Sequence, residues 1–381
     1  MPTVFVARPR AGSEIILSGW VCIAGAAGIK GVDMTERVAV ALSGGVDSSV
    51  AAALLIEAGY DVIGITMDVS RTYGCNAAVT DARRVAEQLG IPFHVFDLHE
   101  AFSREVVEYF AGSYLQGLTP NPCVVCNNKI KFYALAEKAR KLQAVYFATG
   151  HYVRKSYDPG LDRFTLSRGK DKQKDQSYAL FGLTQQQLAM SLFPLGEYRK
   201  EEIRELARKW NLPSAGKEES QEICFIPDND YSRFLEQNRP EAVQPGNIRD
   251  TSGKILGRHR GVAFYTIGQR RGLGIAAGNP YYVVALRPQD REVIVGKAAE
   301  IYRVECRVAM VNWVSIPPPP VPESVTVKIR YTAPAAPAVI EPEGDEVRVS
   351  FNEPQWAVTP GQAAVFYRKD LVLGGGFITC L

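Results

Sequence analysis

The stretch Ser43-Gly44-Gly45-Val46-Asp47-Ser48-Ser49 decides the fold of this 381-residue chain. It follows the apolar run 38–42 (VAVAL), which predicts a buried strand, and it precedes the run 50–56 (VAAALLI), which predicts a helix that Gly59 ends. A glycine-rich turn therefore joins a strand to a helix N-terminus, where backbone N–H groups and the helix dipole favour an anion. Because glycine has no Cβ, a phosphate can approach this backbone closely.

The side chains of the turn suit a nucleotide. Its serine hydroxyls can donate hydrogen bonds to phosphate, and Asp47 can hold Mg²⁺ or contact a ribose. Serine and aspartate also serve as ordinary helix caps, but the full seven-residue stretch directly after a strand is more specific than a cap. The lysine of the GxxxxGK[ST] phosphate loop is missing. The stretch instead resembles the SGGxDS loop of the ATP pyrophosphatases, which implies cleavage of ATP between its α and β phosphates and an adenylated substrate.

The pattern beyond the turn predicts three structural parts. Strands alternate with helices up to about residue 195, which predicts an α/β fold with a parallel, doubly wound sheet whose site lies at the carboxyl ends of the strands. The predicted strands are 61–67, 92–98 and 145–149, and the predicted helices are 79–89, 102–115, 130–142 and 199–210. Glycine-, arginine- and threonine-rich sequence over 245–274 predicts a small domain of short strands. Period-two runs at 325–331 and 346–351 predict a C-terminal antiparallel β-barrel.

These patterns define expected boundaries. We expect a catalytic domain over 34–225, a central domain over 226–300 and a barrel over 301–381. Residues 1–33 show no clear periodicity, and they are interpreted as a disordered or artefactual extension, with a natural start at Met34.

Composition narrows the class of protein. Hydrophobic residues make up 46% and charged residues 22%, with a formal net charge of +3, so the chain is an ordinary globular protein with no overall charge that demands a nucleic acid. No apolar run reaches the ~18 residues of a membrane helix, and we expect no membrane partner. Seven cysteines, an odd number, argue against a secreted disulfide framework and favour metal-binding or catalytic thiols in the cytoplasm. They are Cys22, Cys75, Cys123, Cys126, Cys224, Cys306 and Cys380.

Cysteines also mark the second informative stretch, 119–127 (TPNPCVVCN). Cys126 precedes the predicted helix 130–142, and a helix N-terminus favours the thiolate that nucleophilic chemistry needs. The spacing alone is equally compatible with buried structural thiols, a redox pair or half a metal site. A third thiol, Cys224, lies in the aperiodic sequence 220–227 (SQEICFIP), which is more typical of a functional loop than of a structural element.

Taken together, seven ordered motifs resemble those of the bacterial tRNA-specific 2-thiouridylases. They are the turn at Ser43, the NPxxxCN segment, Gly150-His151-Tyr152, Lys174-Asp175-Gln176-Ser177-Tyr178, SQEICFIP, the HxGxxxYTIGQRxGLG run and Gly361-Gln362-Ala363-Ala364-Val365-Phe366-Tyr367. The resemblance extends from about Glu36 to the C-terminus. It implies an adenine-nucleotide alpha-hydrolase-like domain, a small central domain and a C-terminal barrel. The implied reaction is ATP-dependent adenylation of the wobble uridine of tRNAs for Lys, Glu and Gln, followed by sulfur transfer from a cysteine persulfide, with release of AMP and pyrophosphate.

The resemblance also assigns residues, cofactors and partners. Cys126 is implied as the nucleophile, and Cys224 as the carrier of a persulfide received from a sulfur-donor protein; ATP and Mg²⁺ are the implied cofactors, and tRNA the implied partner. Met67 is as well explained by core packing as by contact with adenine. The implied ATP site comprises Ala41, Leu42, Ser43, Gly44, Gly45, Val46, Asp47, Ser48, Met67 and Gly150; Asn121, Pro122 and Cys123 line the target base; His151, Lys174, Asp175, Gln176, Arg330, Tyr331 and Gln362 contact tRNA.

Cys123 departs from the family pattern, in which Asp is the common residue. Three thiols at Cys123, Cys126 and Cys224 could instead hold a [4Fe–4S] cluster with one open iron that binds the incoming sulfur, an arrangement that resembles other tRNA thiolases of the superfamily. Cys75 is a weaker candidate for a fourth ligand. The persulfide route is placed first and the cluster second.

Two further classes of function remain open at this stage. A pyrophosphate-loop amide ligase would explain the turn at Ser43, but it would not require the paired thiols or the barrel. A non-catalytic nucleic-acid-binding module would not require an intact SGGVDSS sequence. Pyrophosphate release that depends on tRNA separates all three functions.

Overall fold

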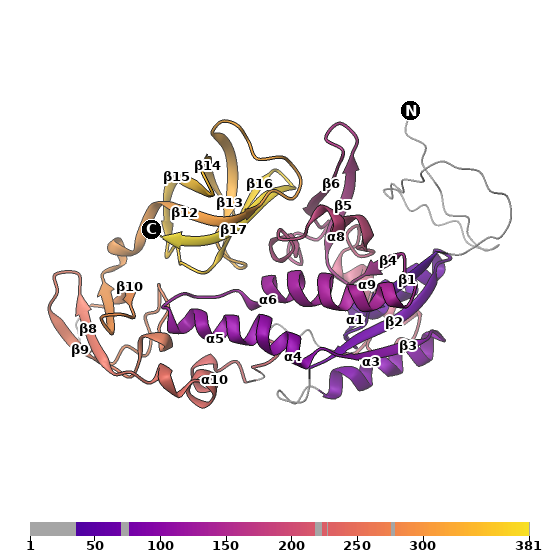
Figure 1. The fold of residues 1–381 in the computed structure, drawn as a ribbon, viewed down its shortest axis with the longest axis horizontal. Coiled ribbons are helices and arrows are strands. Elements are labelled where there is room, and N and C mark those ends of the chain that lie inside the picture. The colour runs from indigo at the N-terminus through magenta and orange to yellow at the C-terminus, as the bar shows by residue number, and fades with distance from the viewer. Residues whose placement is uncertain (1–35, 70–75, 218–222, 227, 276–278, 381) are drawn as a thin grey trace. The chain divides into compact units, whose positions relative to one another are not determined.

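The computed structural model describes residues 36–69, 76–217, 223–226, 228–275 and 279–380 (Figure 1). These residues form two compact units. The first holds the described residues of 1–101, 127–220 and 370–372, and the second holds those of 102–126, 221–369 and 373–381. The predicted extension 1–33 lies wholly before the described residues, and Cys75 lies outside them. Within the described residues, no helix has the length and apolar character needed to cross a membrane.

The first unit is built on a parallel five-stranded sheet with the order β3-β2-β1-β4-β7, which confirms the predicted sheet. The strand order reverses between β1 and β4, so the crevice at their carboxyl ends is the expected ligand site. The strands are β1 (Arg37–Ala41), β2 (Asp61–Asp68), β3 (Phe93–Asp97), β4 (Tyr146–Ala148) and β7 (Ser191–Leu192).

Helices cover both faces of this sheet. On one face, α1 (Val46–Glu57) and α3 (Asn76–Leu89) bury a cluster that includes Val38 and Val40 of β1. The alternate residue Phe147 of β4 points to the other face, where its ring contacts Phe132 at 5.4 Å between centroids. Phe132 belongs to the π-helical stretch η2 (Cys126–Leu135), which α7 (Ala136–Lys141) continues. This double cover is the reason that β1 is apolar at every position after Arg37.

Further elements of the first unit surround the sheet. Helix α9 (Lys200–Lys209) packs on α1 through Ile203 and Ala207. A hairpin that the sequence did not predict is formed by β5 (Val153–Asp158) and β6 (Arg163–Arg168). The remaining short elements are η3 (Ser177–Ala179) and α8 (Gln185–Met190).

In the second unit, the predicted helix 102–115 contains a π-helical turn, η1 (Ser103–Val107), between α4 (His99–Phe102) and α5 (Glu108–Leu115). The helical elements that follow are α6 (Pro122–Val125), α10 (Tyr231–Asn238), η4 (Pro240–Ala242), η5 (Val262–Phe264) and η6 (Ala298–Ile301). A four-stranded sheet has the order β10-β11-β8-β9. Its strands are β8 (Gly246–Asp250), β9 (Ile255–His259), β10 (Tyr282–Arg287) and β11 (Glu292–Gly296).

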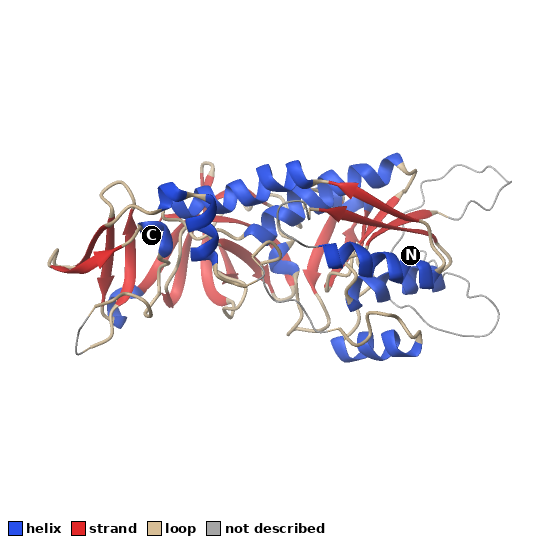
Figure 2. Cartoon of the chain, turned by 90° about the horizontal axis from the view of Figure 1, so that it is seen from below, coloured by secondary structure: helices blue, strands red, loops and turns tan. Residues whose placement is uncertain are grey.

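The C-terminal strands close into a six-stranded antiparallel barrel, as predicted. The order β12-β15-β14-β13-β16-β17 returns to β12 through the β12–β17 pairing, so the barrel has no open edge. Alternate residues such as Val325 and Val327 are buried inside it. Figure 2 shows these strands in red. They are β12 (Tyr302–Asn312), β13 (Glu323–Lys328), β14 (Ala336–Glu343), β15 (Glu346–Trp356), β16 (Ala363–Arg368) and β17 (Leu371–Cys380).

Candidate functional site: the phosphate-binding turn and the cysteine segments

Serine hydroxyls hold the turn between β1 and α1 in shape. The Ser48 hydroxyl accepts a hydrogen bond from the backbone N–H of Ser43 (3.1 Å) and donates one to the carbonyl of Gly45 (3.2 Å). The Ser49 hydroxyl donates to the same carbonyl at 2.7 Å. Gly45 begins α1 without a side-chain cap, so the first N–H groups of the helix have no capping oxygen from this residue. The turn is thus a preformed place for an anion.

Two glycines allow the turn to be packed tightly. Gly44 has φ +73°, and a Cβ there would lie 2.6 Å from Cβ of Asp81 in α3. Gly150 follows β4, and its Cβ would lie 2.7 Å from backbone atoms of both Asp47 and Ser48. The turn is therefore held between α3 and Gly150, two residues after the end of β4, which is the position predicted from the strand order.

Asp47 receives two hydrogen bonds from residues that the sequence did not single out. Its Oδ1 atom accepts from the Tyr152 hydroxyl at 2.7 Å and from the Lys200 ammonium, also at 2.7 Å. Lys200 is the first residue of α9 and is only 5% exposed. A lysine in a charged run at a helix start usually lies in solvent, so only the tertiary fold reveals this contact.

A second lysine contacts the other side of the turn. The Lys217 ammonium donates to the carbonyl of Gly44 at 3.1 Å and also forms an ion pair with Asp81 of α3. Nothing in the local sequence marked this pair, because its members lie in different helices or loops. Two lysines distant in sequence thus flank a turn that contains none.

The remaining residues of the expected ATP site lie at the carboxyl ends of β1 and β2. Leu42 is buried, and its N–H donates to the carbonyl of Ile65 at 2.8 Å. Ala41 is the last residue of β1, and the half-buried Met67 is the second-to-last residue of β2. Contact of Met67 with adenine stays a prediction.

His151, one of the four expected tRNA contacts in the first unit, directly precedes Tyr152. His151 is buried, and its Nδ1 atom lies 2.8 Å from the Thr149 hydroxyl. Burial, assisted by the charge of Lys131, holds the His151 pKa well below its ordinary value, so the ring is neutral near pH 7. A phosphate contact through a cationic His151 is therefore disfavoured.

The loop 174–176 is held by hydrogen bonds within the protein. The Asp175 carboxylate is buried and accepts from the N–H and the hydroxyl of Ser177, at 3.1 and 2.9 Å. The Gln176 side chain accepts from the N–H of Tyr152 at 3.0 Å. The Lys174 N–H donates to Asp171 at 3.3 Å. These contacts shape the surface next to Tyr152, while contact with tRNA stays a prediction.

In the second unit, the segment that carries Cys123 and Cys126 is held at its start. The Asn121 side chain caps α6 by accepting from the N–H of Val124 at 3.3 Å, and Pro122 occupies the first turn. Cys126, at the C-cap of α6, is 8% exposed, whereas Cys123 is exposed. Cys123 is therefore the more accessible thiol of this pair.

The barrel supplies contacts to the same segment. The Gln362 amide donates to the carbonyls of Thr119 at 3.0 Å and Pro120 at 3.3 Å, and the N–H of Thr119 donates to the carbonyl of Pro360 at 2.9 Å. Gly361 has φ +88°, and a Cβ there would lie 2.9 Å from Thr119 backbone atoms. In this structure the Gln362 amide fixes the backbone just before the cysteine segment. Its contact with tRNA stays a prediction.

Cys224 is exposed, but the two residues after it are buried. The ring of Phe225 contacts those of Phe102, Phe110 and Phe234 edge-on, with centroids 5.3–5.8 Å apart. Such aromatic packing anchors a segment strongly. Cys224 therefore lies at the surface directly before an anchored segment.

The other two predicted tRNA contacts near the barrel, Arg330 and Tyr331, differ in character. The Arg330 guanidinium donates to the carbonyl of Trp356 at 2.9 Å and to that of Ala357. Tyr331 is 46% exposed. Arg330 therefore has a structural role in this conformation, and both tRNA contacts stay predictions.

The alternative of an iron–sulfur site finds no support in the geometry. Among the residues that the structure describes, no group of three or more His, Cys, Asp or Glu side chains is placed to hold a metal ion. Cys123, Cys126 and Cys224 are all described and do not form such a group. Sulfur transfer through a persulfide and sulfur transfer through a cluster both stay predictions.

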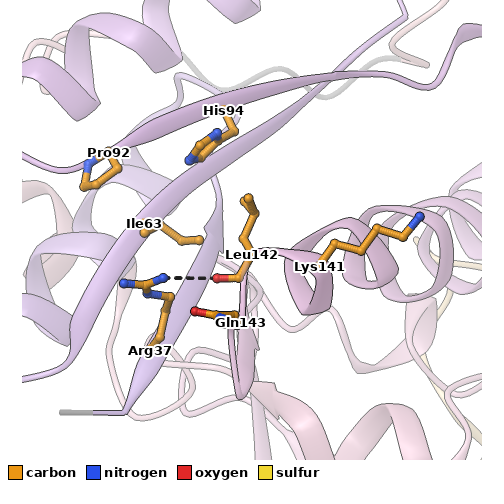
Figure 3. Close-up of a pocket in the computed structure, with 7 residues that line it drawn as sticks. All are labelled: Arg37, Ile63, Pro92, His94, Lys141, Leu142 and Gln143. Carbon is orange, nitrogen blue, oxygen red and sulfur yellow. Dashed lines mark hydrogen bonds between the residues drawn. The ribbon is translucent and has the colours of Figure 1, made fainter. Parts of the chain in front are cut away.

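A cavity of about 350 Å³ lies away from the turn (Figure 3). The Arg37 guanidinium donates to the carbonyl of Leu142 at 3.2 Å across it. Because its lining comes from the starts of β1 and β3, it lies at the amino ends of the strands, opposite to the phosphate-binding turn. The lining residues are Arg37, Ile63, Pro92, His94, Lys141, Leu142 and Gln143.

Comparisons with known proteins match three successive regions of the sequence. Three family profiles match successive regions: "tRNA methyl transferase HUP domain" at 36–228, "tRNA methyl transferase PRC-barrel domain" at 232–297 and "Aminomethyltransferase beta-barrel domain" at 303–378. The tRNA-specific 2-thiouridylase MnmA of Carboxydothermus hydrogenoformans is 52% identical over 90% of this chain and 97% of its own length. The chain belongs to the tRNA-specific 2-thiouridylase family. The Moorella thermoacetica enzyme of the same name is 51% identical over 89% of this chain and 98% of its own.

The profile descriptions mention methyl transfer, but relatives that match nearly from end to end are thiouridylases, and these decide the family. A solved structure, the U34-tRNA thiolase NcsA of Methanococcus maripaludis with its [4Fe-4S] cluster, covers 54% of this chain and 68% of its own at 20% identity and a TM-score of 0.33. A likeness at that level has no bearing on the chemistry of this thiouridylase. The family therefore fixes the reaction class, tRNA uridine 2-thiolation.

Proposed function

We propose that this chain replaces the O2 oxygen of the wobble uridine in tRNAs for Lys, Glu and Gln with sulfur, at the expense of ATP. Membership of the thiouridylase family supports the reaction class. The observation that carries the ATP-dependent half is the turn at Ser43, which presents uncapped helix N–H groups at the switch point of a parallel sheet.

The first step makes the uridine oxygen a better leaving group. The O2 atom attacks the α-phosphorus of ATP, and the bond to the β-phosphate oxygen breaks, so pyrophosphate leaves with the electron pair. Anion-binding N–H groups of α1 stabilise the charge that develops there. The target base must leave its stack first, at a cost of a few kcal/mol, and Asn121, Pro122 and Cys123 would line its pocket.

The second step transfers sulfur. The terminal sulfur of a Cys224 persulfide attacks C2, and AMP leaves with the former O2 atom. The Cys126 thiolate then attacks the inner sulfur of Cys224, which releases 2-thiouridine and leaves a Cys126–Cys224 disulfide. A two-electron thiol reductant restores both thiols. The exposure of Cys224 supports delivery of sulfur by a donor protein.

Mg²⁺ fits this site through Asp47, whose side chain is 34% exposed even though its Oδ1 atom is already hydrogen-bonded. When bound, Mg²⁺ would neutralise phosphate charge. The iron–sulfur route is not favoured, because the described positions of the three thiols do not form a metal-binding group.

The test is a pyrophosphate-release assay with and without tRNA. We expect release that requires tRNA and that is lost in Asp47→Ala, while this variant still binds tRNA. Release without tRNA would favour an amide ligase. Binding of tRNA without any release would favour a non-catalytic binding module.

A further inference from the structure

The phosphate-binding turn has a buried cation within reach, although its own sequence contains none. Residues 41–49 include no lysine or arginine, whereas ATP brings several negative charges and Asp47 adds another. The Lys200 ammonium lies 2.7 Å from Oδ1 of Asp47, which is the second residue of α1 and so lies at the helix end that binds the anion. We propose that Lys200 is a phosphate-binding residue of this site and supplies the cation that the turn lacks.

Burial argues against a purely stabilising ion pair. Lys200 is 5% exposed, whereas the Asp47 side chain is 34% exposed, so the ammonium loses most of its hydration and one ion pair rarely repays that cost. The ammonium also lies 5.7 Å from the centre of the Tyr152 ring, whose hydroxyl donates to the same Asp47 oxygen. A cation kept at this cost beside a phosphate-binding turn is better explained by the charge of the ligand.

The start of α9 is fixed so that the ammonium stays in place. The N–H of Lys200 donates to Asp171 at 3.0 Å, and the N–H of Arg199 donates to Glu202 at 2.5 Å. Glu202 in turn pairs with Lys170 at 3.3 Å. These contacts tie the first turn of the helix to the loop at 170–171, so Lys200 is presented to the turn with little freedom to move away.

This inference rests on the proposed adenylation, and it specifies which residue binds the departing pyrophosphate. In that step the broken bond leaves its electron pair on pyrophosphate, and the Lys200 ammonium offsets the added charge. Binding of pyrophosphate, rather than binding of the adenosine part of ATP, should therefore depend on Lys200. This difference provides a readout that a merely structural residue would not affect.

The test measures binding of inorganic pyrophosphate with Mg²⁺, by calorimetry, to the full chain and to Lys200→Met. Lys209→Met is the matched control, since Lys209 is an exposed lysine on the same helix. We expect the dissociation constant for pyrophosphate to rise at least ten-fold in Lys200→Met, that for AMP to change less than two-fold, and Lys209→Met to match the parent. The KM for MgATP should rise with the pyrophosphate constant.

Two further variants keep the test decisive. Lys200→Arg retains the charge and should bind pyrophosphate within about three-fold of the parent, even if Lys200→Met folds poorly. Unchanged pyrophosphate binding in Lys200→Met, or equal losses for AMP and pyrophosphate, would overturn the inference alone. So would recovery of parent affinity in Lys200→Met/Asp47→Asn, because it would limit Lys200 to balancing Asp47. Failure of the parent itself to bind pyrophosphate would overturn the proposed adenylation as well.

Discussion

Gly44→Ala offers a quantitative test of how the phosphate-binding turn is packed. Alanine at φ +73° costs about 1–2 kcal/mol, because an L-residue with a Cβ is strained in the left-handed region. The new Cβ would also lie 2.6 Å from Cβ of Asp81 and 2.9 Å from the backbone nitrogen of Ala82. Relief of that overlap requires α3 or the turn to move, which costs about 1–3 kcal/mol more. We expect a total loss of about 2–5 kcal/mol.

Gly59→Ala is the matched control at the other end of α1. Gly59 has φ +90°, but a Cβ there meets nothing within 4 Å. Gly59→Ala is therefore destabilised by backbone strain but not by steric overlap. Both variants lower the entropy of the unfolded chain by the same amount. The difference between the two isolates the contact between the turn and α3.

Thermal unfolding and pyrophosphate release together measure the effect. At roughly 2–4 °C per kcal/mol for a unit of this size, Gly44→Ala should unfold several degrees below Gly59→Ala. A shift of about 1 Å in the turn should also slow tRNA-dependent pyrophosphate release by about 100-fold, while Gly59→Ala keeps the parent rate. Equal stability and equal rates for the two variants would refute the packing described here.

Three other predictions concern the thiols and a buried histidine. Cys126→Ser and Cys224→Ser should each abolish thiolation of tRNA and spare pyrophosphate release, because a hydroxyl cannot carry or accept persulfide sulfur; loss of both activities would contradict the two-step scheme. Cys123→Asp should retain most thiolation in protein shown to be free of iron. Loss of bound iron together with loss of turnover in this variant would instead support the iron–sulfur route. Because the folded-state pKa of His151 lies below its unfolded value, its contribution to stability is present above pH ~6.5 and is lost as the pH falls further. The thermal midpoint of the parent should therefore fall more steeply below pH 6.5 than that of His151→Asn.

Local patterns in the sequence were enough to predict the frame of the molecule. The strand before Ser43 and the helix after it follow from an apolar run, two glycines and a capping residue, all within about 20 positions. The barrel follows from period-two runs such as 346–351. The π-helical turns and the β5–β6 hairpin were missed, because π-helices lack a distinct residue pattern and the hairpin interrupts the α/β alternation.

Contacts between distant residues could not be predicted in the same way. Lys200 lies 153 positions after Asp47, and Gln362 lies 243 positions after Thr119. No local periodicity encodes such pairs, since they form only when the strands and helices have packed. The motifs identified the turn and the cysteines, whereas the structure identified the residues that surround and hold them.

The central claim is that the uridine oxygen leaves on AMP. The most direct measurement uses a tRNA whose wobble uridine carries ¹⁸O at O2, incubated with the enzyme, MgATP and a persulfide donor. Mass spectrometry then follows the label in AMP and the sulfur in the nucleoside. The proposed chemistry predicts one ¹⁸O in AMP for each 2-thiouridine formed. Formation of 2-thiouridine with unlabelled AMP would contradict it, because the oxygen would then have left without having been adenylated.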